Sequence, residues 1–277
     1  MNKESSKNIL LKIMKKEGLN PLSVAITLQI FDILKVLNKL ANMVELLGMK
    51  KILKYFSIFE WCLWIGSIIT VVIFFVVLQN KEWLYLVTTI AGVTSLIFLA
   101  KGNLVGLILS TIFSIFYTIV SITYRYYSEV ITYCFMTLPI TIISLIQWIK
   151  NPYKGNKNEV EIVELKKDQY ANIIVAGAGI SIVFYFVLTW LNVPNLIFST
   201  ISIFTSFVAA YLSLKRSRFY AIAYAINDIV LIILWALATV KDLSYLAIVI
   251  CFVSFFVNDV YAFINWTKLY KKQRKGL

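Results

Sequence analysis

The sequence predicts an all-α membrane protein with eight transmembrane helices, arranged as one N-terminal span followed by a 3+1+3 bundle of two parallel repeats. Three observations predict this fold class: an apolar composition, eight long apolar runs, and basic residues that segregate to one side of those runs. Of the 277 residues, 60% are hydrophobic and 15% are charged. Soluble domains are about 45–50% apolar and about a quarter charged. We therefore expect lipid to cover much of the surface.

The composition also excludes several classes of protein. Histidine is absent, which removes His-containing metallopeptidases, Ser-His-Asp hydrolases and histidine proton relays. Cys62, Cys134 and Cys251 lie inside apolar runs without a CxxC pair, so we expect neither a zinc site nor any other metal or cofactor. The net charge is +13, but the sequence contains neither an arginine-rich arm nor a helical motif that reads nucleic acid, so we expect no nucleic-acid partner.

Residues 1–54 are expected to form a cytoplasmic or interfacial segment with an amphipathic helix. Within 22–49, Asp32, Lys35, Lys39 and Asn42 recur at spacings of three and four and form one polar stripe. Such a helix fits the headgroup plane of a membrane. The alternative is a cytoplasmic helix packed on the bundle.

A membrane-spanning helix needs about 20 apolar residues. Residues 55–266 are expected to form the transmembrane domain, and 267–277 a basic cytoplasmic tail. The eight predicted spans are 55–79, 83–100, 104–124, 127–149, 171–191, 196–214, 217–239 and 243–266.

The basic residues predict the orientation of these spans. An eight-span arrangement places 24 of the 27 Lys and Arg residues on one side, leaving Lys81, Arg125 and Lys241 for the other. Cytoplasmic loops carry the excess of Lys and Arg. Both termini are therefore predicted to be cytoplasmic.

Weak internal similarity predicts two repeats, at about 83–149 and 196–266. The segment TTIAGVTS at 88–95 resembles STISIFTS 111 residues later, and QWIK at 147–150 matches NWTK 118 residues later. A linker helix at 171–191 separates the repeats, so an even number of crossings lies between equivalent helices. The repeats therefore point the same way, as in transporters with parallel repeats.

Polar residues inside the spans predict a binding site. Asp228 lies about 16 Å into the seventh span, near the bilayer midplane, and shares a helix face with Tyr224. Asp259 lies about 10 Å from the cytoplasmic end of the eighth span. Intramembrane acids are costly and by default functional, although a structural role for either carboxylate is the alternative.

Carboxylates and aromatic faces attract cations, and amides add directional hydrogen bonds. We therefore expect a flat organic cation or a heteroaromatic ring bearing a sugar. The candidate binding residues are Tyr117, Gln147, Trp148, Tyr224, Asn227, Asp228, Asn258 and Asp259.

Other interpretations compete at several of these positions. Trp148 and Trp266 end spans, where an interfacial aromatic belt is the alternative. Tyr117 could be packed with its hydroxyl on a backbone carbonyl. Glu60 and Glu129 lie near span ends and are expected to face water or headgroups. Gly102 and Gly106 are expected to serve a turn and close packing.

These residues resemble the PnuC-type vitamin transporters over roughly residues 55–270. The family shows Tyr-Gly-Asp or Tyr-Gly-Glu where this chain has Tyr127-Ser128-Glu129, and Tyr-Gly-x-x-x-Trp where it has YAFINW at 261–266. In the seventh span the family carries Trp-x-x-x-Asn or Trp-x-x-x-Asp, against Tyr224-x-x-x-Asp228 here. Tyr replaces Trp and two glycines are lost, which bears on the substrate more than on the fold.

The resemblance implies a SWEET-like bundle, a homotrimer in the bacterial inner membrane, and facilitated uptake of nicotinamide riboside followed by trapping through cytoplasmic phosphorylation. It leaves open thiamine, riboflavin or deoxyribonucleosides as substrates. From the residues alone, a non-transporting scaffold or sensor is the second alternative. A membrane enzyme is disfavoured because the acids lie on separate spans and histidine is missing.

Overall fold

The computed structural model describes residues 55–78, 83–123, 126–240 and 242–275, and the N-terminal segment with its predicted amphipathic helix lies outside them. Eight helices in this part are long and apolar enough to cross a membrane, which confirms the predicted number of spans. The elements are α4 (Ile58–Val77), α5 (Trp83–Ala100), α6 (Leu104–Thr123), α7 (Tyr127–Val130), the π-helix η1 (Ile131–Thr137), α8 (Leu138–Lys150), β1 (Pro152–Tyr153), β2 (Asn156–Val160), α9 (Lys167–Trp190), α10 (Leu196–Leu214), α11 (Tyr220–Thr239), the 3-10 helix η2 (Leu243–Tyr245) and α12 (Leu246–Lys275).

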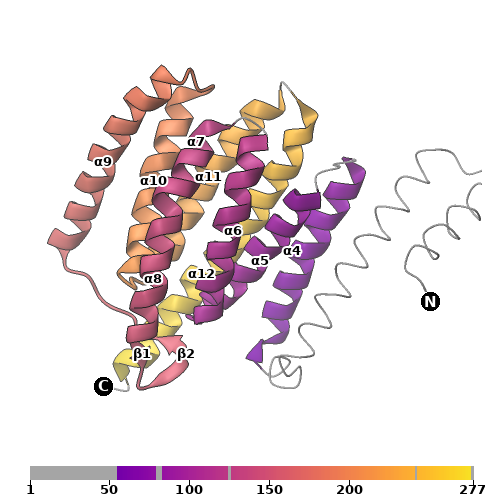
Figure 1. The fold of residues 1–277 in the computed structure, drawn as a ribbon. Coiled ribbons are helices and arrows are strands. Elements are labelled where there is room, and N and C mark those ends of the chain that lie inside the picture. The colour runs from indigo at the N-terminus through magenta and orange to yellow at the C-terminus, as the bar shows by residue number, and fades with distance from the viewer. Residues whose placement is uncertain (1–54, 79–82, 124–125, 241, 276–277) are drawn as a thin grey trace, which may run out of the picture.

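Helix packing closes a ring (Figure 1). Within the described residues, α5 packs on α6, α6 on α8, α8 on α10, α10 on α11, α11 on α12, and α12 returns to α5. Two helices lie outside this ring: α4 packs on α5 and α12, and α9 packs on α10. The six helices of the ring therefore enclose a central space, while α4 and α9 extend the bundle at its edges.

The span Tyr127–Lys150 is continuous but not regular. It begins as the short α7, widens into the π-helix η1 and continues as α8, with Pro139 at the start of the last segment. Proline has no N–H to donate within the helix, and here it lies where the wide turns of η1 give way to the regular α8. Widened turns of this kind are rare and frequently occur at functional sites. The apolar pattern of the sequence could not reveal this irregularity.

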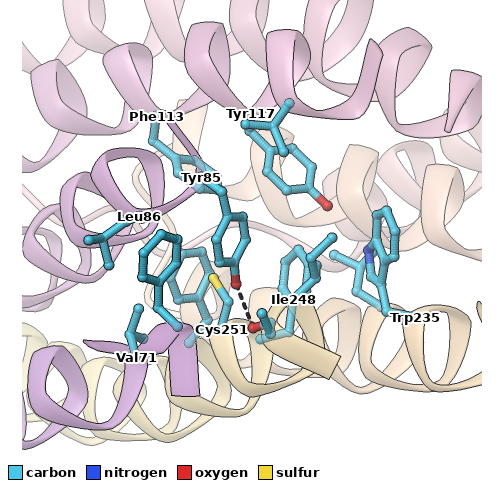
Figure 2. Packing of buried hydrophobic residues seen from close by; sticks show 14 of the residues in the cluster. Val71, Tyr85, Leu86, Phe113, Tyr117, Trp235, Ile248 and Cys251 are labelled. Atoms are coloured by element: carbon cyan, nitrogen blue, oxygen red, sulfur yellow. Dashed lines mark hydrogen bonds between the residues drawn. The ribbon is translucent and has the colours of Figure 1, made fainter. Parts of the chain in front are cut away.

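Two apolar clusters fill the ends of the ring. One cluster includes Val71, Tyr85, Phe113, Trp235 and Phe252. Figure 2 shows part of this cluster, in which the Tyr85 hydroxyl donates to the backbone carbonyl of Ala247. The second cluster lies at the end of the bundle that carries the β-hairpin. Its members include Leu99, Trp148, Val160, Leu212, Trp266 and Tyr270. The space between the two clusters is left for polar side chains.

The loop after α8 forms a cap that the apolar pattern did not predict. Strands β1 and β2 pair antiparallel, and the Val160 N–H donates to the Gly102 carbonyl at 3.0 Å. The side chain of Gln273 accepts from the Ile162 N–H at 2.9 Å and donates to the Val160 carbonyl at 3.0 Å. The segment expected as a basic tail after Trp266 is therefore helical to Lys275 and docked against this hairpin.

Gly102 and Gly106 have the turn and packing roles expected of them. Gly102 adopts a φ of +66° at the turn after α5, a conformation that glycine accepts without strain. Gly106 lies where α6 approaches α5, and an added Cβ would meet the Leu99 amide nitrogen at 2.6 Å and the Ser95 carbonyl oxygen at 2.9 Å.

We expect Gly106→Ala to lower the free energy of unfolding by about 1–3 kcal/mol, the usual cost of overpacking, because backbone atoms cannot move aside like a flexible side chain. Gly66→Ala in α4 is the matched control, since nothing lies within 4 Å of its added Cβ. The control should be neutral or stabilising by up to about 1 kcal/mol, because alanine favours helix. Thermal unfolding of the detergent-solubilised protein measures both, and equal midpoints would contradict the close approach of α5 and α6.

Candidate functional site

A polar cavity lies in the middle of the ring, between the two apolar clusters. All six helices of the ring contribute to its wall, and its volume is about 60 Å³. One water molecule needs at least about 10–15 Å³ of such space, so the cavity has room for a few waters. Pockets for organic ligands measure about 300–1,000 Å³. The cavity is therefore contracted and has to widen to admit an organic solute.

Hydroxyl groups make up much of the wall. The serines and threonines that line the cavity are Ser95, Ser110, Ser114, Thr137, Thr141, Ser144, Ser206 and Ser213. Several donate their proton to a carbonyl one turn back, as Ser144 does to Ile140 at 2.7 Å and Ser114 to Ser110 at 2.9 Å. With the proton engaged, the hydroxyl oxygen remains as an acceptor. The wall therefore favours a solute that carries donors or positive charge.

Asp228 and Asp259 bring two carboxyl groups together at this cavity. Asp228 comes from α11 and Asp259 from α12; both are buried, both line the cavity, and their side chains interact electrostatically. Two neighbouring buried carboxyl groups cannot both ionise without a countercharge, so one of them keeps a proton. Among the described residues that line the cavity there is no Lys or Arg, and Asp228 Oδ2 has no hydrogen-bond partner. The pair is thus an acidic site without a countercharge.

Tyr224 and Asn227 complete the part of the site that the sequence analysis named. Tyr224 lines the cavity one helical turn before Asp228, as their spacing predicts. The Asn227 side-chain oxygen accepts from Thr205 Oγ1 at 2.7 Å and from Ser206 Oγ at 2.9 Å, which ties α11 to α10. Because this oxygen is engaged, only the amide NH₂ of Asn227 remains for a ligand.

Other named candidates lie away from the cavity. The Asn258 amide nitrogen donates to Ser67 Oγ at 3.0 Å and to the Ser254 carbonyl at 2.8 Å, so this side chain joins α12 to α4. Gln147 is exposed on the outer face of α8. Asn258 and Asp259 point in directions about 100° apart on the helix, so only Asp259 faces the cavity.

Trp148 and Trp266 are packed inside the bundle rather than at its surface. They are 1% and 0% exposed, and their ring centroids lie 5.5 Å apart. The Trp148 indole N–H donates to the Ser213 carbonyl at 3.1 Å, and that of Trp266 donates to the Leu99 carbonyl at 2.8 Å. Neither lines the cavity in this conformation; both belong to the apolar cluster at the hairpin end, and their burial rules out an interfacial belt.

Two glutamates contradict the expectation that they face water or headgroups. Glu60 is 3% exposed, where it pairs with Lys101 at 3.1 Å and accepts from the Tyr261 hydroxyl at 2.7 Å. Glu129 is fully buried. Both residues lie near span ends, but the rotation of each helix about its axis decides whether the side chain faces the bundle. Position along the span therefore could not predict their burial.

Tyr117 is also buried outside the cavity wall, and its hydroxyl has no hydrogen-bond partner among the described residues, so the predicted bond to a backbone carbonyl is absent. Tyr133 and Phe255, which the sequence analysis did not single out, do line the cavity. Tyr133 lies in the π-helix η1, whose wide turns change which residues share a face of the helix. The regular spacing of apolar residues therefore could not predict that Tyr133 faces the cavity. The serine and threonine spacing on α6 and α8 was the available signal for the wall.

The eight-helix bundle with its central acidic cavity defines the class of protein: a multi-pass membrane protein built to admit a small polar solute. Residues 82–268 match the family described as nicotinamide mononucleotide transporter, and the chain belongs to this family. It is thus a multi-pass protein of a bacterial inner membrane. The match runs from the start of α5 into α12, so α4 lies outside it.

Individual relatives are similar over most of the chain. The nicotinamide riboside transporter PnuC of Neisseria mucosa is 27% identical over 204 residues, covering 71% of this chain and 76% of that relative. The corresponding protein of Haemophilus influenzae is 23% identical, covering 76% and 90%. The crystal structure of the vitamin B3 transporter PnuC aligns with a TM-score of 0.68 at 25% identity, covering 79% of this chain and 94% of that one.

We expect Trp266→Phe to destabilise the protein by about 0.5–1.5 kcal/mol, because one buried hydrogen bond is lost while most of the ring packing remains and the Leu99 carbonyl still accepts from the Gly102 N–H and the Tyr220 hydroxyl. Trp190→Phe is the control, since Trp190 is 80% exposed. Thermal unfolding in detergent compares the two variants. A Trp266→Phe midpoint no lower than that of Trp190→Phe would contradict a structural role for this hydrogen bond.

Proposed function

We propose that the protein transports nicotinamide riboside across the membrane and binds it at Asp228 and Asp259, with Tyr224 and Asn227 beside them. The observation that carries this proposal is the pair of buried carboxyl groups in a hydroxyl-lined cavity without a countercharge. Nicotinamide riboside joins a cationic aromatic ring to a sugar with hydroxyl donors. The acids suit the ring and the serine and threonine oxygens suit the sugar.

The same site disfavours the phosphorylated form of this solute. A mononucleotide would bring a phosphate with about 1.5 to 2 negative charges into a cavity that already holds two carboxyl groups. Like charges in a site of low dielectric repel strongly. The riboside in the names of the two relatives therefore fits this cavity better than the mononucleotide in the family's description.

Thiamine is the first alternative, because it is also an aromatic cation. Riboflavin and deoxyribonucleosides are neutral and would leave the second carboxyl group uncompensated. A non-transporting membrane scaffold or sensor is the remaining alternative. After entry, we propose that cytoplasmic phosphorylation traps the riboside, since a passive carrier accumulates nothing by itself and the sequence carries no ATP-binding P-loop.

We also propose that residues 83–149 and 196–266 are parallel repeats joined by α9, as in a SWEET-like bundle. The packing order supports this: α5–α6 corresponds to α10–α11, α6–α8 to α11–α12, and α8–α10 to α12–α5. Trp148 and Trp266 occupy equivalent positions, and each donates to the end of the first helix of the other repeat. Their mutual contact supports two repeats that run in the same direction.

The orientation and assembly follow as further parts of the proposal. Lys150 ends α8 next to β1, Lys215 follows α10, and Lys268 lies in α12 between two residues of the cluster at the hairpin end, so we place that end and both termini in the cytoplasm. Helix α9 exposes Val175, Val183 and other large apolar side chains, which suit lipid or the neighbouring subunit of a homotrimer. Residues 1–54 then form the cytoplasmic or interfacial segment.

We expect Asp228→Asn to weaken the binding of nicotinamide riboside at least tenfold, because it removes one of the two carboxyl groups that interact with the cation. Asp168→Asn, which removes an exposed acid at the start of α9, is the matched control and should bind like the wild type. Ligand-induced thermal stabilisation against nicotinamide riboside, its mononucleotide, thiamine and riboflavin measures the effect. Unchanged binding by Asp228→Asn for every cation tried would rule out this site, and wild-type stabilisation by the mononucleotide alone would overturn the choice of substrate.

Binding of the riboside should also release a proton, because the cation takes the place of the proton shared by Asp228 and Asp259. Calorimetric titration in two buffers of different ionisation enthalpy detects this release as a buffer-dependent heat. Asp259→Asn removes the need for a shared proton and serves as the comparison. Equal heats in the two buffers for the wild type would contradict the exchange.

A further inference from the structure

A second group of buried polar atoms lies in the half of the bundle away from the β-hairpin. Nine buried side-chain atoms of the described residues have no hydrogen-bond partner, and seven of them come from neighbouring positions on α6, α7 and α11. These atoms belong to Tyr117, Ser121, Tyr126, Ser128, Glu129 and Trp235. Buried polar groups are nearly always satisfied, so a concentration of exceptions in one place calls for an explanation.

Glu129 is the centre of this group. Its side chain is fully buried, and neither carboxyl oxygen accepts a hydrogen bond. Ser202 on α10 faces the carboxyl group, but its hydroxyl donates to the Ser199 carbonyl at 2.9 Å. None of the salt bridges between described residues includes Glu129. The carboxyl group is thus buried without an ion pair among the described residues, and the Ser202 hydroxyl lies beside it.

Aromatic rings stand beside this acid. The centroids of Tyr126 and Trp235 lie 4.3 Å apart, and those of Tyr117 and Tyr133 lie 4.4 Å apart. Glu129 interacts electrostatically with all three of these tyrosines. In Figure 2 the Tyr117 hydroxyl points toward Trp235. A carboxyl group close to several aromatic rings supplies the two kinds of group that attract an organic cation.

Tyr133 connects this group to the cavity. It lines the cavity and interacts electrostatically with both Glu129 and Asp228. It belongs to the π-helix η1, four residues after Glu129, and such widened turns frequently mark functional sites. The rings of Phe113, Tyr117 and Tyr133 pack on one another, and Tyr133 interacts with acids of both sites.

We propose that Glu129, with Tyr126 and Trp235, forms a second binding site for an aromatic organic cation, reached from the side of the membrane opposite the β-hairpin. The transported solute occupies this site before it passes Tyr133 and reaches Asp228 and Asp259. This inference rests on the proposed transport of an aromatic cation. The rings are packed together here, so the site opens when α7 and η1 move away from α11.

The test uses right-side-out membrane vesicles that contain the full chain and take up labelled nicotinamide riboside. N-methylquinolinium, a flat organic cation, is added outside. We expect it to inhibit uptake by the wild type competitively, and we expect Glu129→Gln to raise the inhibition constant at least tenfold. Asp242→Asn is the matched control, because it removes the same charge from an exposed position at the same end of the bundle and should leave inhibition unchanged.

Each outcome decides between the proposals. Equal inhibition of the wild type and Glu129→Gln, or no inhibition of the wild type, overturns the second site, while a wild type that takes up no riboside overturns the proposed function. Retained thermal stabilisation of Glu129→Gln by the riboside shows that this variant folds. If Glu129→Gln does not fold, Tyr126→Leu at the start of α7 is the second variant, because it removes an aromatic ring and keeps the charge of Glu129. We expect it to raise the inhibition constant at least threefold, and an unchanged constant overturns the site. Uptake and inhibition should be the same in Na⁺ and K⁺ buffers, since a requirement for Na⁺ would assign Glu129 to a metal cation instead.

Discussion

The contact between Asp228 and Asp259 is the constraint on which the rest of the structure depends. A charged side chain facing lipid near the bilayer centre costs several kcal/mol, so these acids need protein or water around them. The ring of six helices supplies that environment, with apolar clusters above and below and hydroxyl groups at the level of the acids. The acids thereby determine which faces of α11 and α12 turn inward.

The same constraint explains how function follows from the fold. A shared proton can satisfy the two carboxyl groups, and a cation can replace it when a solute binds. Because the cavity is contracted, the exchange requires the helices to separate at one end or the other. Tyr133 and Phe255, from one apolar cluster, and Leu99 and Leu107, from the other, border the cavity, so the passage of a solute has to displace side chains of these clusters.

Much of the fold could be predicted because the bilayer imposes simple rules on the sequence. Span number follows from apolar length, and the face shared by Tyr224 and Asp228 follows from helical spacing. Side-chain direction near helix ends could not be predicted, which is why Glu60 and Glu129 were expected at the surface and are buried. The π-turn of η1 and the hairpin that docks on Gln273 depend on tertiary contacts that no local pattern encodes.

The most direct test of the central claim is an experimental structure with nicotinamide riboside bound. The account predicts density for the pyridinium ring beside the carboxyl groups of Asp228 and Asp259, with the ribose against the serine and threonine wall and the cavity widened around both. A riboside bound elsewhere in the bundle, or a structure in which either carboxyl group faces lipid, would contradict the account.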